Sequence, residues 1–237
     1  YLSETFPQIT SLQYVHNPKR NDTIYDLEPV VYKGKDHIIE QLGDYKFKIG
    51  TKSFFQTNSL QAKVLYDVTK EFAALKPDDV VYDLYTGVGS IALYVSGGCK
   101  KVVGIEQIEP AIADAKINAQ LNNVSNCSFY AGDVRMVFNP DFIATNGRPD
   151  VVITDPPRAG MHEDVVKTLL ELAAPKIVYV SCNAATQARD LQLLSEKYEV
   201  TRVQPVDMFP HTTHIENVAL LVLKGGELNS IEIKANT

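Results

Sequence analysis

The residue of this chain best suited to covalent chemistry is Cys182, which follows the apolar run 177–180 after one intervening residue, Ser181. Such a run reads as a buried strand, and open α/β sheets bind ligands at the carboxyl ends of their strands. A thiolate there would be a nucleophile, whereas most lone cysteines are small buried apolar residues, as we expect for Cys99 and Cys127. Glu216 precedes another apolar run, in a setting that suits a semi-buried carboxylate. A nucleophile and a late carboxylate together suggest covalent catalysis.

A glycine-containing turn indicates a cofactor site. The run Asp83-Leu-Tyr85-Thr-Gly87-Val-Gly89 follows a predicted strand and precedes a helix, so its backbone can approach a ligand closely. Alone, the turn is equally compatible with a structural role. Glu106 lies about 20 residues further on, at the end of the next strand, where an acid binds ribose hydroxyls. The third glycine of the dinucleotide fingerprint is missing, which favours S-adenosylmethionine, a cofactor without phosphates, over NAD.

The sequence Asp155-Pro-Pro-Arg158 marks a rigid corner at a strand end, because proline fixes its φ angle. In amino-methyltransferases a similar corner carries an aromatic residue that stacks on the target base. Arg158 instead suits hydrogen bonds or phosphate contacts, which disfavours methylation of an exocyclic nitrogen. His211 and His214 could resemble metal ligands, but two histidines without a third ligand make a poor site, and we expect no metal.

The order of the predicted elements is typical of a doubly wound, Rossmann-like α/β sheet, in which strands and helices alternate. Strands are expected at 80–85, 102–105, 127–130, 151–154, 177–180, 200–206 and 218–223. Helices are expected at 58–75, 91–95, 110–121, 165–172 and 186–194, the first of them ended by Lys76-Pro77. Three short strands, at 12–16, 29–32 and 45–49, lie between turn residues. We therefore assign residues 1–52 to a central β-rich domain and 53–237 to a cofactor-binding domain.

The composition narrows the class of protein. The net charge of −6 argues mildly against an autonomous nucleic-acid binder, whose affinity depends on neutralising phosphates. Three widely spaced cysteines without a CxxC pair indicate neither an iron–sulfur or zinc site nor a disulfide framework. Free thiols fit a reducing compartment, and no apolar run approaches the roughly 18 residues of a membrane span. We expect a cytoplasmic monomer without membrane contact.

Five runs together resemble the RNA uracil-5-methyltransferases, which form 5-methyluridine in tRNA or ribosomal RNA. The runs lie in family order, and the segment before them is similar to the end of the family's central domain. They are Ser53-Phe-Phe-Gln-Thr-Asn58, Asp83-Leu-Tyr-Thr-Gly-Val-Gly89, Asp155-Pro-Pro-Arg-Ala-Gly160, Ser181-Cys-Asn183 with Ala185-Thr-Gln-Ala-Arg-Asp-Leu191, and Met208-Phe-Pro-His-Thr-Thr-His-Ile-Glu-Asn-Val218. Full-length members carry an amino-terminal RNA-binding β-barrel, and some hold an iron–sulfur cluster with four cysteines. The resemblance thus implies a carboxy-terminal catalytic fragment.

The resemblance implies a role for each matching position. Cys182 is expected to be the nucleophile and Glu216 the general base. The sequence departs from the family pattern at two positions: Thr86 stands where members often have Cys, and Ala184 stands where Pro usually follows Ser-Cys-Asn. Neither position has a role that requires a particular functional group. The expected cofactor-binding residues are Gln56, Tyr85, Gly87, Gly89, Glu106, Asp133 and Asp155, and the expected substrate-binding residues are Phe55, Arg158, Asn183 and His211.

The implied reaction methylates C5 of a uridine through a covalent adduct between Cys182 and C6. Addition of the thiolate turns C5 into an enolate-like carbon, which takes the methyl group; a base then removes the C5 proton and the thiol is eliminated. Because the target base must leave its stack, a loop uridine is favoured over one in a duplex. The choice between tRNA and ribosomal RNA stays open. Two alternatives also stay open: a cytosine-5 RNA methyltransferase, and a cofactor-bound RNA chaperone without turnover.

Overall fold

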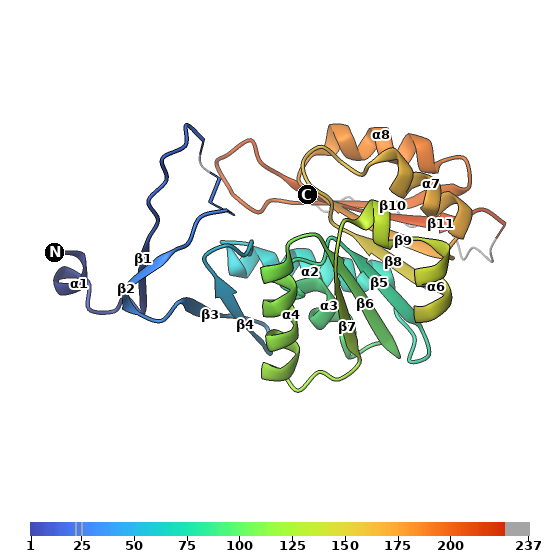
Figure 1. The fold of residues 1–237 in the computed structure, drawn as a ribbon. Helices are drawn as coiled ribbons and strands as arrows, with labels where there is room; N and C mark the ends of the chain where they lie inside the picture. The colour runs from blue at the N-terminus through green and yellow to red at the C-terminus, as the bar shows by residue number, and fades with distance from the viewer. Residues whose placement is uncertain (22, 25, 226–237) are drawn as a thin grey trace.

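The computed structural model describes residues 1–21, 23–24 and 26–225, and its centre is a seven-stranded sheet (Figure 1). The strands lie in the order β10-β11-β9-β8-β5-β6-β7, with β5 to β9 parallel and β10 and β11 antiparallel to their neighbours. They are β5 (Val80–Leu84), β6 (Lys101–Glu106), β7 (Cys127–Ala131), β8 (Val151–Thr154), β9 (Lys176–Ser181), β10 (Tyr198–Val206) and β11 (Glu216–Leu223). The predicted α/β fold class is thereby confirmed.

Helices cover both faces of this sheet (Figure 1). One apolar cluster joins the sheet to α2 (Ser59–Ala73), α3 (Ser90–Ser96) and α4 (Glu109–Leu121). A second cluster joins it to α5 (Val134–Val137), α6 (Pro140–Asn146), α7 (Glu163–Leu172) and α8 (Ala184–Leu194). Successive strand residues point to opposite faces, so Val81 packs in the first cluster and Tyr82 in the second. The inner parallel strands β5, β6, β8 and β9 are therefore mostly apolar, with their polar residues at or near the strand ends, whereas the edge strand β10 carries polar residues along its length.

The amino-terminal part of the chain forms two small antiparallel pairs. After the short helix α1 (Leu2–Thr5), β1 (Ser11–Tyr14) pairs with β2 (Val30–Gly34), and β3 (His37–Leu42) pairs with β4 (Tyr45–Gly50). Leu42 and Phe47 of the second pair are buried in the cluster that contains α2, α3 and α4. This hairpin thus shares its core with the sheet domain, and the division of the chain at residue 52 remains a prediction.

Several boundaries differ from the predicted ones for local reasons. The helix α2 ends at Ala73, before Lys76-Pro77, because Ala74 adopts a left-handed conformation with φ of 42°. The helix α8 begins at Ala184, two residues early, because the side chain of Asn183 accepts a hydrogen bond from the Ala185 amide. The strand β3 was not predicted, since its apolar residues do not alternate, although the Gly43-Asp44 turn that follows it is a hairpin signal. The short helices α1, α5 and α6 were also missed.

Candidate active site

A pocket of about 360 Å³, part of it open to solvent, lies beside the loop that follows β5. Tyr85 in this loop has a φ of +66°, an unusual value for a bulky residue and one that is typical of functional loops. Gly87 also has a positive φ, of +56°, and a Cβ built on it would meet no atom within 4 Å. Gly87 is also one of the residues that line the pocket, so the absence of a side chain leaves open space at this part of the lining. The lining comprises Phe54, Phe55, Gln56, Tyr66, Asp83, Tyr85, Thr86, Gly87, Val88, Ser90, Ile91 and Asp155.

Gly89 has a different reason to be glycine. Its φ is +79°, and an added Cβ would lie 3.0 Å from the Phe129 ring and 3.2 Å from the Ala115 side chain. Gly89 therefore allows close packing of the loop against β7 and α4, whereas Gly87 faces the pocket. The two predicted glycines of this loop thus have different surroundings, since Gly89 is closely packed and Gly87 borders open space.

Two carboxylates hold this loop and retain capacity for a ligand. Glu106 accepts hydrogen bonds from the backbone amides of Gly87 (3.2 Å) and Ile108 (2.9 Å). Asp83, fully buried, accepts from the Thr86 hydroxyl and the Ala92 amide through Oδ2, but its Oδ1 has no partner among the described residues. Burial raises the pKa of Asp83 to about 7. A buried acceptor without a partner costs free energy, so a donor from a ligand would stabilise it.

The register of the sheet brings Cys182 and Glu216 together. In the antiparallel pair of β9 and β11, Ser181 lies opposite Asn217, so the next residues in that register are Cys182 and Glu216. Residues opposite each other on neighbouring strands have Cβ atoms about 5 Å apart. Glu216 is 7% exposed, and burial raises its pKa to about 7, partly countered by the Arg158 guanidinium. A carboxyl group with this pKa exchanges protons near neutral pH, as a general base must.

The thiol of Cys182 is half-buried, and burial and then the charge of Glu216 raise its pKa. Arg158 acts in the opposite direction and partly offsets both effects. Cys99 and Cys127 lie in less polar surroundings, where burial raises their pKa values to about 11 and about 12. Arg158 is thus the positive group that favours a thiolate at position 182. Nearby Asp155 has a pKa well above its ordinary value because of burial and the charges of Glu216 and Asp83.

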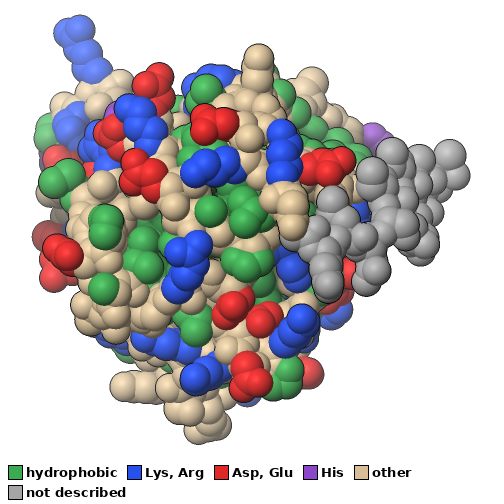
Figure 2. All heavy atoms as spheres, turned by 90° about the vertical axis from the view of Figure 1, so that its right-hand side faces the viewer, with side chains coloured by type: hydrophobic (Ala, Val, Ile, Leu, Met, Phe, Trp, Pro, Cys, Tyr) green, Lys and Arg blue, Asp and Glu red, His purple; other side chains and the backbone are tan. Residues whose placement is uncertain are grey.

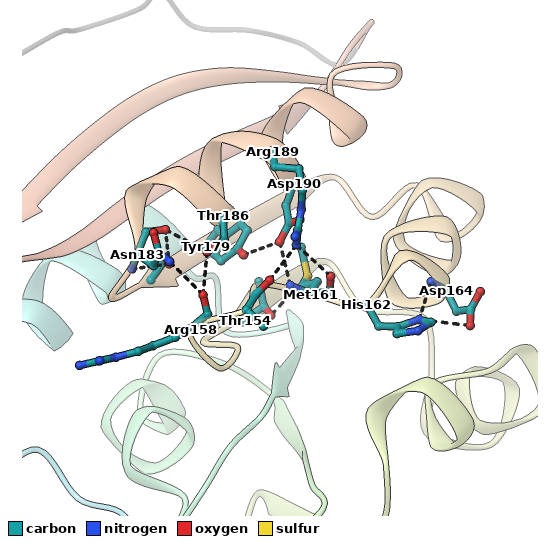
Figure 3. A network of polar contacts seen from close by, with 12 residues as sticks. Thr154, Arg158, Met161, His162, Asp164, Tyr179, Asn183, Thr186, Arg189 and Asp190 are labelled. Atoms are coloured by element: carbon teal, nitrogen blue, oxygen red, sulfur yellow. Dashed lines mark hydrogen bonds and ion pairs between the residues drawn. The ribbon is translucent and has the colours of Figure 1, made fainter.

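The corner that carries Arg158 is bound to the start of α8 (Figure 3). The backbone carbonyl of Arg158 accepts hydrogen bonds from Asn183 Nδ2 (3.1 Å) and from the Thr186 hydroxyl (3.0 Å). Asp190, fully buried, accepts from the Met161 amide (2.8 Å) and the Tyr179 hydroxyl (2.7 Å). These bonds fix the corner relative to the turn with Cys182. They also engage the side chain of Asn183, so the structure gives this predicted substrate-binding residue a structural task.

The remaining predicted residues have a variety of surroundings. The carboxylate of Asp133 forms an ion pair with Arg135, which lowers its pKa. Phe55 lines the pocket, but its ring also packs on Phe47 at a centroid distance of 5.4 Å. His211 is exposed and has a φ of +70°. Within the described ranges, no three His, Cys, Asp or Glu side chains are grouped so as to hold a metal ion.

The structure adds pocket residues that were not predicted. Phe54 is 71% exposed although it lines the pocket, which makes it the more accessible aromatic residue of the Phe54-Phe55 pair. Tyr66 and Ser90 lie in the same lining and share a hydrogen bond of 2.9 Å. For Asp83 a signal existed, because it is the first residue of the glycine-containing motif. Tyr66 and Ser90 carry no such signal, since each reads as an ordinary helix residue.

Residues 141–224 match the sequence model of a family described as tRNA (Uracil-5-)-methyltransferase. Two relatives named as uncharacterized RNA methyltransferases are each 57% identical to this chain, one from Bacteroides thetaiotaomicron over 224 residues and one from Porphyromonas gingivalis over 223 residues. The alignments cover 94% and 93% of this chain but 49% and 48% of those proteins. The chain therefore spans about half the length of these relatives.

Among solved structures, the tRNA (uracil-54, C5)-methyltransferase of Pyrococcus abyssi, in complex with S-adenosyl-L-homocysteine, superposes with a TM-score of 0.78 at 37% identity. The match covers 93% of this chain and 53% of that one. Trm5b of the same organism has a TM-score of 0.67 at 16% identity and shares the fold alone. The chain thus matches this family's sequence model over residues 141–224 and is similar in structure to a tRNA uracil-5-methyltransferase over 93% of its length.

Proposed function

We propose that this chain transfers a methyl group from S-adenosylmethionine to C5 of a uridine in RNA, with Cys182 as a covalent nucleophile. The observation that supports the proposal is the pairing of β9 with β11, which ends at Ser181 and Asn217; Cys182 and Glu216 are the next residues on the two segments, and the charge of Glu216 acts on the Cys182 thiol. Both residues lie at the edge of the sheet where the loop after β5 forms the pocket. The similarity to a tRNA (uracil-54, C5)-methyltransferase in complex with S-adenosyl-L-homocysteine supports the same reaction class.

The residues of the pocket fit this cofactor. The free Oδ1 of Asp83 suits an ammonium group such as that of the cofactor's methionine part. Glu106 has one backbone donor on each carboxylate oxygen and retains lone pairs for ribose hydroxyls. Gly87 leaves the space that a ligand would occupy, and Gln56, Tyr85 and Asp155 complete the proposed set, with Asp133 further along the same edge. When bound, S-adenosylmethionine would supply an electrophilic methyl group.

The side chains around Cys182 account for the remaining chemistry. The thiolate of Cys182 adds to C6 of uracil, and the electron pair of the C5–C6 double bond moves into an enolate. The electron pair at C5 would then bond to the methyl group of the sulfonium, whose methyl–sulfur bond breaks to leave a neutral thioether, after which Glu216 removes the C5 proton. The electrons of the broken C5–H bond restore the double bond and expel the thiolate. Arg158 favours the thiolate form at the start and at the end of this sequence.

The proposed substrate is a uridine in an RNA loop, where the base leaves its stack at lower cost. The face shown in Figure 2 mixes Lys and Arg side chains with Asp and Glu, in line with the net charge of −6. We therefore propose that local groups such as Arg158, and segments of the longer relatives, contribute much of the affinity for RNA. His211 and the exposed Phe54 are further candidates for substrate contact. Among the residues described, no helix is long and apolar enough to cross a membrane.

A labelling experiment tests the proposed reaction. The chain is incubated with methyl-labelled S-adenosylmethionine and, separately, with tRNA and ribosomal RNA from a strain without the corresponding gene. The RNA is then digested to nucleosides. We expect label in 5-methyluridine, its loss in Cys182→Ala and its retention in Cys99→Ala. Label in 5-methylcytidine would identify a cytosine-5 enzyme, and cofactor binding without label in either RNA would favour a non-catalytic binding module.

A further inference from the structure

Two polar residues of α4, together with the residue that directly follows its last turn, form a polar stripe along one side of the helix. Asp114, Asn118 and Asn122 are spaced four residues apart and therefore lie above one another on the helix surface. Asn118 is fully buried and Asp114 is 7% exposed. Burying a polar side chain costs free energy unless it forms hydrogen bonds. The hydrogen-bond partners of these three residues therefore show which part of the chain the stripe binds.

The stripe binds the chain segment that leads into one wall of the pocket. Asn122 pairs with the backbone of Lys46, accepting from its amide at 2.8 Å and donating to its carbonyl at 2.7 Å. Asn118 pairs in the same way with Lys48, accepting at 2.6 Å and donating at 3.3 Å. Asp114 accepts from the Lys48 ammonium (3.1 Å) and from the Ser53 hydroxyl (2.9 Å). The next residues after Ser53 are Phe54, Phe55 and Gln56 of the pocket lining.

Asn118 makes one additional contact that Asn122 does not make. Its Nδ2 also donates to the backbone carbonyl of Val88 at 3.1 Å. Val88 lies between Gly87 and Gly89, and Glu106 holds the same loop through the Gly87 amide. The loop is thus held at two neighbouring residues. Asn118 of α4 donates to the carbonyl of Val88, and Glu106 of β6 accepts from the amide of Gly87.

We propose that Asn118 is a positioning residue that sets the cofactor loop against the segment 46–56, so that the two walls of the pocket keep a fixed separation. The proposal goes beyond the methyl-transfer chemistry and rests on the proposed function only in the identity of the ligand. A glycine-containing loop has many accessible conformations, so a bond to its backbone reduces the entropy lost on binding. Asn118 is not itself one of the residues that line the pocket; it reaches the lining through its hydrogen bond to the backbone of Val88.

The test compares Asn118→Ser with Asn122→Ser. Both variants lose the paired bonds to β4, but only the first loses the bond to Val88. Calorimetry with S-adenosyl-L-homocysteine should show affinity about five- to tenfold weaker for Asn118→Ser, the loss of about one hydrogen bond, and within about twofold of the parent for Asn122→Ser. Hydrogen exchange on the ligand-free chain should be faster at residues 85–90 in Asn118→Ser alone.

The exchange measurement separates the failure of this inference from the failure of the proposed function, because it requires no ligand. Faster exchange in the loop of Asn118→Ser alone supports the inference even if S-adenosyl-L-homocysteine does not bind the parent chain. Equal exchange and equal affinity in the two serine variants would overturn it. If Asn118→Ser does not melt cooperatively, Asn118→Thr replaces it, because its hydroxyl also cannot reproduce the three bonds of the amide while its additional methyl group fills more of the buried space.

Discussion

Replacing Glu216 with glutamine should stabilise the folded chain while it disables the proposed base. Burial raises the pKa of Glu216 from 4.5 to about 7, so the folded protein holds the charged form at a free-energy cost. At about 1.4 kcal/mol per pKa unit, that cost is about 3 kcal/mol once the group is fully ionised. Glutamine keeps the size of the side chain and carries no charge, although its amide still costs something to bury. The gain is therefore at most about 3 kcal/mol.

The stability gain should depend on pH in a definite direction. Below the unfolded value of 4.5 the carboxyl group is protonated in both states, so it contributes no penalty. Between 4.5 and about 7 the unfolded chain loses the proton first, and the penalty grows as the pH rises. Above about 7 it is complete. The stabilising effect of Glu216→Gln should thus be small at pH 5 and largest at pH 8.

Thermal melts at pH 5 and pH 8 measure this difference, with Glu196→Gln, on an exposed acid, as the control. A gain of up to about 3 kcal/mol corresponds to several degrees for a chain of this size. The same variant should trap methylated RNA on the protein as a band that resists denaturation, because elimination stalls without the base. A lower melting point at pH 8 together with no trapped band would show that Glu216 is a structural acid and would refute the reasoning.

Three further outcomes are expected. Gly87→Ala should weaken binding of S-adenosyl-L-homocysteine and reduce the free energy of unfolding by only about 1–2 kcal/mol. Gly89→Ala should lower the melting point more, because its new methyl group overlaps packed side chains. Equal behaviour of the two variants in calorimetry and thermal melts would contradict this. Arg158→Ala should raise the pKa of the Cys182 thiol further and slow its alkylation at pH 8, and an unchanged rate would exclude the ascribed role of the guanidinium. Glu106→Ala should weaken cofactor binding by about 1–3 kcal/mol in calorimetry, and unchanged affinity would refute its assignment.

The order of strands and helices could be predicted because each long element carries its own signal. Buried parallel strands appear as short apolar runs, and polar residues such as Glu106 and Cys182 lie within two residues of the ends of those runs. Local reading was therefore sufficient to place the proposed nucleophile and the cofactor loop at one edge of the sheet. The elements that local reading missed, such as β3 and α6, are short or lack periodicity.

The contacts between distant segments could not be predicted, because they depend on the register and on tertiary packing. Nothing near Asn183 in the sequence indicates that its side-chain Nδ2 donates to the backbone carbonyl of Arg158, 25 residues away. Likewise, Asn118 reads as a polar position of a helix and reaches Lys48 and Val88 only after the hairpin has docked. The raised pKa of Glu216 has the same origin, since its burial depends on the neighbouring strands.

The central claim, covalent catalysis by Cys182, is tested most directly with RNA that contains 5-fluorouridine. Fluorine at C5 prevents removal by a base, so the adduct should accumulate when S-adenosylmethionine is present. Peptide mass spectrometry should then find a methylated fluorouridine on Cys182, and Cys182→Ala should abolish it while Cys99→Ala and Cys127→Ala do not. An adduct that persists in Cys182→Ala, or methyl transfer to uridine by that variant, would contradict the account.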